Sequence, residues 1–485
     1  MSLFLISLAI LIVGYIIYGK VTEKIFGIDP ERKTPAVTMR DDVDYTPMPT
    51  WKVFLIQFLN IAGLGPIFGA IMGVMFGPAA FLWIALGTIF AGAVHDFFSA
   101  MISVRAGGVS LPEIIGHELG GGIKFVMRLF SIVLLILVGV VFVVTPSGII
   151  AGMTPEWMDK TFWVFAIFTY YILATLLPID KLIGNFYPIF GFALLFMAVG
   201  LMYVMLFGEA TIPVLLADGF QNKQPADAAP THPIFPMMFV SIACGAISGF
   251  HATQSPMMAR CLKNEKLARP VFFGAMVAEG VVALIWAAAA VTFTGGYEGL
   301  SEYMQNHTPG NLVTDVSLGW LGTFGGILAI LGVVVAPITS GDTALRSARL
   351  IAADFLKIKQ TKIAKRLLIS IPLFAITYIV MQLDFNTLWR YFAWSNQTLS
   401  VFTLWAVTVY LARKRKFWIV SIVPAMFMTT VCVSYLLFAP RPEGFGLSQD
   451  IAVYSGIAVA IICSVIFAIY RRNILKEGSN IKFDY

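Results

Sequence analysis

Residues 58–69 read FLNIAGLGPIFG and lie inside an apolar run that extends from residue 52 to residue 76. An α-helix needs about 20 apolar residues to cross the hydrocarbon core of a membrane, so this run is long enough to span it. Gly63, Gly65 and Pro66 interrupt the run near its middle, where proline removes a backbone donor and clashes with the preceding turn. Backbone that unwinds at this depth must be satisfied by protein or line a cavity. The stretch therefore predicts an interrupted transmembrane helix.

A second apolar run, at residues 234–260, contains the sequence CGAISGFHATQSP at residues 244–256. It is also rich in glycine, is unusually polar and ends in proline. Gly245 follows the start of its run at the same separation as Gly63 follows Lys52. Two interrupted helices, each opening a set of five spans, are typical of inverted-repeat transporters whose site lies at the breaks. Two ordinary kinked helices are the alternative interpretation.

The composition is that of a membrane protein. Of 485 residues, 58% are hydrophobic and only 12% are charged, with a mean hydropathy of +0.84, whereas a soluble protein carries about a quarter charged residues. We therefore predict an all-α polytopic membrane protein of about 13 transmembrane helices, with a five-plus-five inverted-repeat core, one N-terminal and two C-terminal extra helices. The predicted spans are residues 2–19, 52–76, 79–104, 123–147, 161–178, 186–208, 234–260, 270–294, 320–348, 366–383, 387–411, 416–438 and 450–470.

The basic residues orient these spans. If the N-terminus lies outside, all but four of the 33 Lys and Arg residues fall in inward connections, and the exceptions are Lys160, Lys223, Arg390 and Arg441. This asymmetry is the positive-inside rule, so we expect a multi-pass protein of the plasma (cell inner) membrane with a cytoplasmic C-terminus. The expected divisions are 1–51 (extra helix and cytoplasmic loop), 52–208 (first repeat), 209–411 (outer loop and second repeat) and 412–485 (two helices and cytoplasmic tail).

Three ionisable residues share one depth in the membrane. Asp96, His251 and Glu279 each lie nine or ten residues from the nearest cytoplasmic arginine of their own run, which places them roughly 13–15 Å deep, near the bilayer centre. Such groups pair, face a polar cavity or relay protons. We expect proton coupling here, with satisfied structural hydrogen bonds as the alternative. His95, offset by about 100° from Asp96 on the helix, is as readily a packing residue.

Asp342 is the third carboxylate within the apolar runs. Arg346 lies one helical turn further on, so Asp342 serves either proton coupling or a structural ion pair at the cytoplasmic rim. Thr339, Ser340 and Thr343 offer oxygens for a possible sodium ion, although hydroxyls in membrane helices mostly bond their own backbone. Asn396 and Gln397 are costly to bury and are expected to form polar contacts between helices.

Several functions are excluded or disfavoured. No HExxH, GxSxG or P-loop pattern is present, so the sequence predicts neither an enzyme nor an ATP-driven pump. The basic residues lie between apolar runs rather than on one domain, which argues against nucleic-acid binding despite a net charge of +6. The four cysteines form no CxxC pair, and no metal or other cofactor is expected.

Five motifs resemble the carbon starvation protein A family: NIAGLGP at 60–66, AGAVHDF at 91–97, SGFHA at 248–252, DTALRSAR at 342–349 and LWRYFAWSNQ at 388–397. The resemblance implies a proton-coupled or cation-coupled uptake carrier for peptides or pyruvate, induced during nutrient limitation. It also implies kinship with the amino acid–polyamine–organocation superfamily, whose leucine-transporter-like five-plus-five repeat agrees with the partition above. Longer family members carry further C-terminal sequence that this chain lacks.

Together these observations predict a secondary active transporter. A small carboxylate-bearing solute, peptide or pyruvate, would bind between the breaks, where half-helix N-termini present free N–H groups. H⁺ is the expected coupling ion and Na⁺ the alternative, and rocking of the repeats would expose the site alternately. A nutrient sensor, a channel or a sodium-coupled amino acid carrier are the competing functions, and the oligomeric state is open. The expected substrate contacts are Asn60, Gly63, Gly65, Pro66, Gly245, Ser248, Gly249 and His251.

Overall fold

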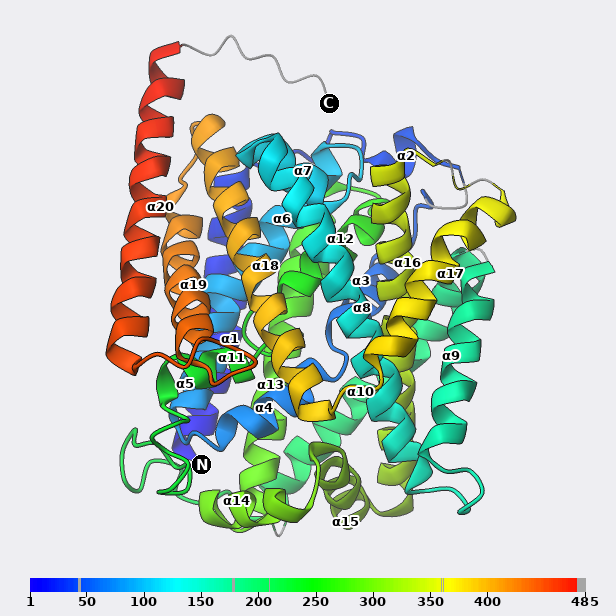
Figure 1. Cartoon of the computed structure of the whole chain (residues 1–485), viewed down its shortest axis with the longest axis vertical. Coiled ribbons are helices and arrows are strands. Elements are labelled where there is room, and N and C mark those ends of the chain that lie inside the picture. Colours follow the sequence, from blue (N-terminus) through cyan, green and yellow to red (C-terminus); the bar gives the residue numbers. More distant parts are fainter. Residues whose placement is uncertain (42–44, 177–178, 209, 359, 361, 478–485) are drawn as a thin grey trace.

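The computed structural model describes the whole chain except residues 42–44, 177–178, 209, 359, 361 and 478–485. Within the described residues every regular element is a helix, and the only strand-like contact is an isolated bridge between Lys33 and Asn264. Figure 1 shows an upright bundle in which α1 (Ser2–Phe26) starts at the lower end and α20 (Gln449–Glu477) finishes at the upper end. The chain therefore begins and ends on opposite faces. Which face is cytoplasmic stays a prediction.

The first predicted interruption is present. α3 (Thr50–Ile61) and α4 (Gly65–Val74) are bent by 47° across three residues that belong to neither helix. Pro66 occupies the first turn of α4, where its missing N–H leaves no intrahelical bond unmade. The glycine–proline sequence thus ends one helix and starts the next.

The second predicted interruption is also present. A short helical segment made of η2 (Ile234–Met238) and α11 (Phe239–Ser241) is followed by non-helical residues 242–248 and then by α12 (Gly249–Ala259). Ser248 has an extended backbone, with φ −149° and ψ 125°, immediately before α12. Both breaks therefore lie where the glycine-rich stretches predicted them.

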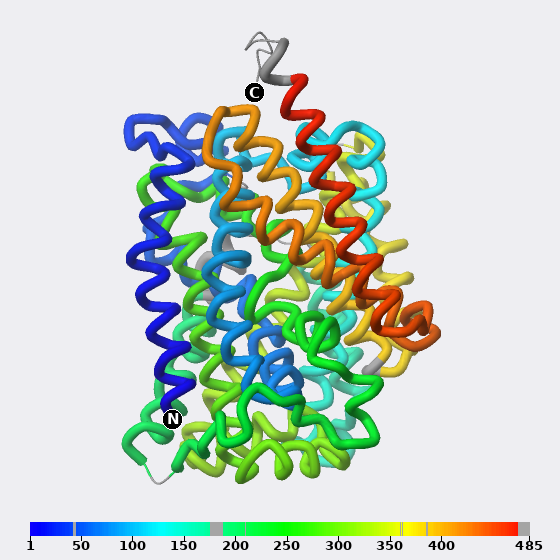
Figure 2. Tube along the Cα trace, turned by 90° about the vertical axis from the view of Figure 1, so that its left-hand side faces the viewer, coloured from blue at the N-terminus to red at the C-terminus, as the bar shows by residue number. Residues whose placement is uncertain are grey.

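The remaining long helices enclose these two. α6 (Ala93–Arg105), α12 and α13 (Gly274–Phe293) are almost wholly buried, whereas α1 and α20 expose rows of apolar side chains. Figure 2 shows α1 (blue) and α20 (red) running along the outside of the bundle. The others are α5 (Ala79–Gly87), which continues into α6, α8 (Gly121–Ala151), α9 (Lys160–Leu176), α10 (Ile179–Phe207), α16 (Ala336–Leu356), α17 (Ile363–Val380), α18 (Phe385–Arg413) and α19 (Ile419–Phe438).

Four short or displaced helices were not predicted, because none of them forms a long apolar run. They are α2 (Pro35–Thr38), α7 (Leu111–Leu119), α14 (Tyr297–Asn306) and the first part of α15 (Pro309–Ala329). α15 starts at a capping box formed by Thr308 and Asn311 and kinks at Gly322, whose φ is +61°. The predicted span at 320–348 therefore belongs to a longer helical stretch that begins at Pro309. Figure 1 shows α14 and α15 at the lower end of the bundle.

By length and apolar composition, fewer described helices qualify as membrane spans than the thirteen predicted. Among the described residues, nine helices are long and apolar enough to cross a membrane, and the bent pair α3–α4 makes a tenth. The other three predicted spans correspond to α9, which has 17 residues, to the interrupted segment ending in α12, and to α18, which carries Asn396 and Gln397. The count of thirteen thus stays a prediction.

Candidate functional site

The two breaks pack directly against each other. A Cβ atom added at Gly65 would lie 2.2 Å from Cβ of Cys244, and one at Gly73 would lie 2.2 Å from Cγ1 of Ile242. A Cβ on Gly245 would approach Cα of Pro66 at 3.6 Å. Glycine thus lets α4 lie against the unwound residues of the second break. Gly65, Gly69, Gly73 and Gly77 recur every four residues in the sequence. Gly77, however, lies beyond α4 in a turn with φ +102°.

The first break contains a buried polar group without a protein partner. Neither the oxygen nor the nitrogen of the Asn60 side chain forms a hydrogen bond to any described residue, although Asn60 is fully buried. By contrast, the hydroxyl of Ser340 on α16 donates to the carbonyl of Leu59 at 3.0 Å. Because an unpaired buried amide is costly, Asn60 is the residue of this break best suited to meet a solute.

Two side chains of α18 satisfy the second break. Oδ1 of Asn396 accepts from the Ser248 hydroxyl at 3.0 Å and from the backbone N–H of Phe250 at 2.7 Å, and its Nδ2 donates to the Ala243 carbonyl at 3.2 Å. Nε2 of Gln397 donates to the carbonyl of Ile242 at 3.2 Å. The N-terminus of α12, which the sequence offered to a substrate carboxylate, is therefore already occupied by Asn396.

Gly63 and Gly249 are closely surrounded by protein. A Cβ on Gly249 would lie 2.5 Å from the Asn396 carbonyl oxygen, and one on Gly63 would lie 2.8 Å from Cζ of Phe142. The backbone of α18 leaves no room for a side chain at Gly249, whereas a side chain at Gly63 would require the Phe142 ring to move. Packing accounts for these two residues without a bound solute.

The ionisable residues predicted at one depth form a single buried chain of contacts. Oδ1 of Asp96 lies 2.7 Å from Nδ1 of His95, and Oδ2 of Asp96 lies 2.9 Å from Nδ1 of His251. On its other side, Nε2 of His251 lies 3.3 Å from Oε2 of Glu279. All four side chains have no exposed surface. Helices α6, α12 and α13 thus bring His95, Asp96, His251 and Glu279 together as one cluster, termed here the His–Asp cluster.

Asp342 belongs to a separate contact. Its Oδ2 lies 3.6 Å from Nη2 of Arg346 on the same helix, and both side chains are buried. The neighbouring hydroxyls bond backbone, as Thr339 donates to the Ala336 carbonyl and Thr343 donates to the Ser340 carbonyl. The hydroxyl of Ser340 contacts the Ala336 carbonyl of its own helix and also reaches α3 through the Leu59 carbonyl.

A metal ion is conceivable at one point of the site. Sγ of Cys244, a nitrogen of His251 and a carboxylate oxygen of Glu279 lie within 4.8 Å of one another. Each already contacts protein, however, because Cys244 lies 3.3 Å from Nδ2 of Asn396 and His251 contacts Glu279. Nε2 of His251 and both carboxylate oxygens of Glu279 nevertheless have no hydrogen-bond partner among the described residues. The expectation of no metal stays a prediction.

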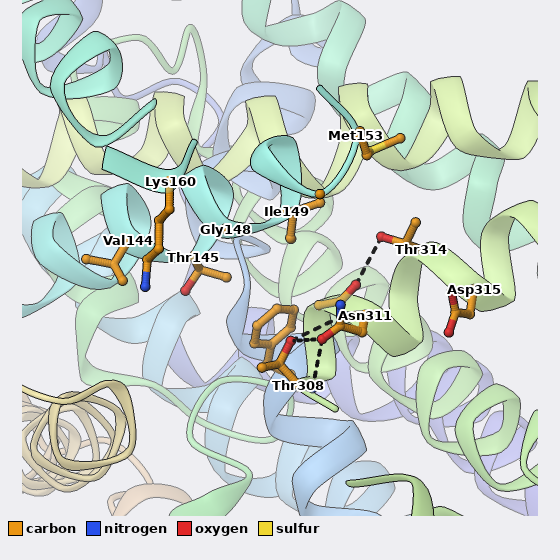
Figure 3. A pocket seen from close by; sticks show the side chains of 13 residues that line it. Val144, Thr145, Gly148, Ile149, Met153, Lys160, Thr308, Asn311, Thr314 and Asp315 are labelled. Carbon is orange, nitrogen blue, oxygen red and sulfur yellow. Dashed lines mark hydrogen bonds between the residues drawn. The ribbon is translucent and has the colours of Figure 1, made fainter. Parts of the chain in front are cut away.

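A cavity of about 400 Å³ is lined in part by the start of α15, which lies at the lower end of the bundle in Figure 1. Figure 3 shows its lining, which combines the last turns of α8, the start of α9 and the start of α15. Phe68 of α4 also lines it, so the cavity reaches the first broken helix. The sequence did not predict this cavity. The lining includes Phe68, Val144, Thr145, Ile149, Lys160, Asn311, Thr314 and Asp315.

Aromatic rings lie beside the first break, and one of them, Phe68, also lines the cavity. Phe142 lies 6.3 Å from Phe250 and 6.4 Å from Phe392 between ring centroids, and Phe68 lies 6.0 Å from Trp389. Phe142 also covers Gly63, as the close approach above shows. We term these five rings the aromatic layer. In this conformation a solute in the cavity does not touch the breaks.

Solved structures define the class to which this architecture belongs. A manganese transporter from Eremococcus coleocola matches with a TM-score of 0.53 at 12% identity, over 90% of this chain and 99% of that one. Mhp1, a nucleobase-cation-symport-1 family transporter, matches with a TM-score of 0.53 at 13% identity, over 87% and 93%. The chain thus has the leucine-transporter-like fold of secondary transporters. The predicted fold class is confirmed.

The family follows from sequence. Residues 1–155 and 149–313 match the family described as carbon starvation protein CstA. The chain belongs to the carbon starvation protein A family, as its five motifs predicted.

Relatives of this chain include named transporters. The peptide transporter CstA of Bacillus subtilis is 26% identical, and the match covers 96% of each chain. The pyruvate/proton symporter BtsT of Escherichia coli is 29% identical over 59% of this chain but only 48% of its own length. An uncharacterized membrane protein of Haemophilus influenzae is 44% identical over 62% of this chain and 93% of its own. The chain is therefore a multi-pass membrane protein of a transporter family.

Proposed function

We propose that this protein is a proton symporter that imports a small organic solute, a peptide or pyruvate, by alternating access. The central observation is the His–Asp cluster, four titratable side chains in mutual contact and fully buried beside the breaks. Ionisable groups inside a membrane domain are costly and mark proton or substrate paths. A protein that only needed packing at this depth would fill it with apolar side chains.

The His–Asp cluster can pass a proton between helices. Asp96 contacts two imidazoles at once, and His251 contacts a carboxylate through each of its ring nitrogens. Loss or gain of one proton changes which of these contacts is a charged hydrogen bond. Because His251 belongs to the second broken helix, protonation would change how firmly that helix is held to α6 and α13.

Asn60 provides the polar contact proposed for the solute. It lies in the last turn of α3, directly before the break, and its amide has both a donor and an acceptor to offer. Peptides and 2-oxo acids both carry carbonyl oxygens that an amide N–H can bind. The substrate position is therefore proposed at the first break, rather than at the occupied N-terminus of α12.

Uptake by purified protein in proteoliposomes tests this function. Labelled dialanine or pyruvate should accumulate when the outside is made acidic and should stop when a protonophore removes the gradient. A sodium gradient without a pH gradient is the matched control. Accumulation driven by sodium alone would replace the proton proposal by sodium coupling, for which Ser340 and the Leu59 carbonyl offer oxygens.

Two further results would exclude a carrier. A current that exceeds carrier turnover and does not saturate with solute would indicate a channel. Binding of solute without exchange of labelled solute across the membrane would indicate a sensor.

A further inference from the structure

The cavity lined by the start of α15 has one basic and one acidic side chain in its wall. Lys160 at the start of α9 and Asp315 in the second turn of α15 both line it, and Figure 3 shows them on opposite sides. No ion pair joins Lys160 to any described residue. Asp315 accepts a hydrogen bond from the Tyr303 hydroxyl at 2.5 Å through Oδ2, which leaves Oδ1 to face another donor.

The lining between these charges is polar on one part and apolar on another. Thr145 is 8% exposed, and its hydroxyl has no hydrogen-bond partner among the described residues. Because Thr145 lines the cavity, that hydroxyl is a buried polar group available to a molecule inside it. Thr314 and Asn311 add further polar groups, while Val144 and Ile149 provide apolar surface. Such a lining, in about 400 Å³, is typical of a small-molecule site.

We propose that this cavity is a loading site for zwitterionic solutes, in which Lys160 faces the carboxylate and Asp315 faces the ammonium group of a short peptide or amino acid. The proposal rests on the proposed transport function and names its substrate class. A monocarboxylate such as pyruvate has nothing to place against Asp315. The hydroxyl of Thr145 would bind a peptide group that lies between the two ends.

The location supports a loading role rather than a second transport site. Phe68 belongs both to the cavity wall and to the aromatic layer, so a bound solute would contact this layer, in which Phe142 covers Gly63 of the first break. The cavity lies at the end of the bundle where the chain begins, which is the face expected to be outside. A solute held there would be ready to enter when the rings move.

Four compounds with matched variants test this assignment. Dialanine has both charges, N-acetyl-dialanine and pyruvate lack the ammonium group, and dialanine amide lacks the carboxylate. The variants are Lys160→Met and Asp315→Asn, with Lys223→Met and Asp218→Asn as controls. Lys223 and Asp218 form an ion pair with each other at 2.5 Å and do not line the cavity.

Binding is measured by thermal shift of the purified protein, and uptake is measured in parallel. We expect Lys160→Met to weaken dialanine about three- to tenfold, since charge-assisted contacts contribute that much. Asp315→Asn should weaken dialanine similarly while leaving N-acetyl-dialanine unchanged. The control variants should match the wild type.

Two outcomes overturn the loading site. The first is that dialanine does not shift the wild-type melting temperature, and the second is that the cavity variants bind all four compounds as the controls do. Failure of the transport proposal looks different, because uptake would be absent while dialanine binding and its loss in the two cavity variants persisted. Pyruvate binding stronger than that of dialanine and insensitive to Asp315→Asn would assign the cavity to monocarboxylates instead.

Discussion

Single side chains of this protein do one of two things in the membrane interior: they satisfy other groups or they stay available. Asn396 belongs to the first kind, because its amide bonds both sides of the second break. Asn60 belongs to the second, because neither end of its amide is bonded to a described residue. The same side-chain chemistry therefore holds the second break together and, at the first break, is proposed to bind the solute. The sequence analysis had assigned Asn60 to the solute and Asn396 to contacts between helices, and the solute contact of Asn60 stays a prediction.

Asp96→Asn gives the sharpest prediction at this scale. Asparagine retains the size and some hydrogen bonds of Asp96 but cannot bind the coupling proton, so gradient-driven uptake should fall to the level of empty liposomes. Exchange of labelled substrate at equal pH on both sides should persist, because it requires no net proton movement. The measurement compares the two assays in the same preparation.

Asp218→Asn serves as the control for this variant, since Asp218 is an exposed residue that pairs with Lys223. If Asp96→Asn still concentrates substrate against its gradient, Asp96 has only a packing role.

Depth was the property of individual residues that sequence captured well. Asp96, His251 and Glu279 were expected at one level because helical rise is regular, and they do meet. His95 was left undecided because its direction depends on how neighbouring helices rotate. Lys160 was recognised only as one of four outer basic residues, since a cavity built from α8, α9 and α15 has no signature in any one of those segments.

Among the elements, the broken helices are held by close backbone approach. α4 lies so near residues 241–244 that only hydrogen fits at its facing positions. Glycine and proline indicate these breaks in the sequence, because they are the residues that end helices. Short helices such as α7 and α14 carry no comparable signal, since they neither span the membrane nor form a long apolar run. The sequence therefore predicted the two broken helices but not short helices such as α7 and α14.

Gly65→Ala should destabilise the contact between the two breaks. Its Cβ would lie 2.2 Å from Cβ of Cys244, so one segment must move, at a cost of about 1–3 kcal/mol. The melting temperature in detergent should fall accordingly. Gly122→Ala, at a helical position with no heavy atom within 4 Å of the added Cβ, should leave it nearly unchanged.

A double variant identifies the clash as the cause. Gly65→Ala combined with Cys244→Gly should be more stable than the sum of the two single changes predicts, because the colliding atom is gone. Strict additivity would show that the glycine is needed for another reason.

At the scale of the whole molecule, the segment after α1 is fastened across the end of the bundle. Glu265 is fully buried, accepts two hydrogen bonds from Arg105 at 2.9 and 3.0 Å, and accepts a third from the backbone N–H of Asp29 at 2.9 Å. Asn264 donates to the Pro30 carbonyl at 2.6 Å, and Thr34 donates to the Leu262 carbonyl. The loop between α12 and α13 is thereby joined to the segment that follows α1.

Glu265→Gln should loosen this fastening. The amide cannot accept from Arg105 and Asp29 together without turning a donor toward one of them, and the arginine loses its buried counter-charge. We expect faster amide hydrogen exchange at residues 27–34 and a lower melting temperature. Glu298→Gln, on the exposed side of α14, is the control. Unchanged exchange at residues 27–34 would contradict the role given to Glu265.

The unequal anchoring of the two breaks has a consequence for how the protein moves. Asn396 and Gln397 of α18 form several hydrogen bonds to the second break, so we expect α18 and this break to move together. Next to the first break, the Ser340 hydroxyl of α16 donates to the Leu59 carbonyl of α3. We expect α3 to move against α16 during transport, which would break the Ser340 bond and make Asn60 accessible while the second break stays attached to α18.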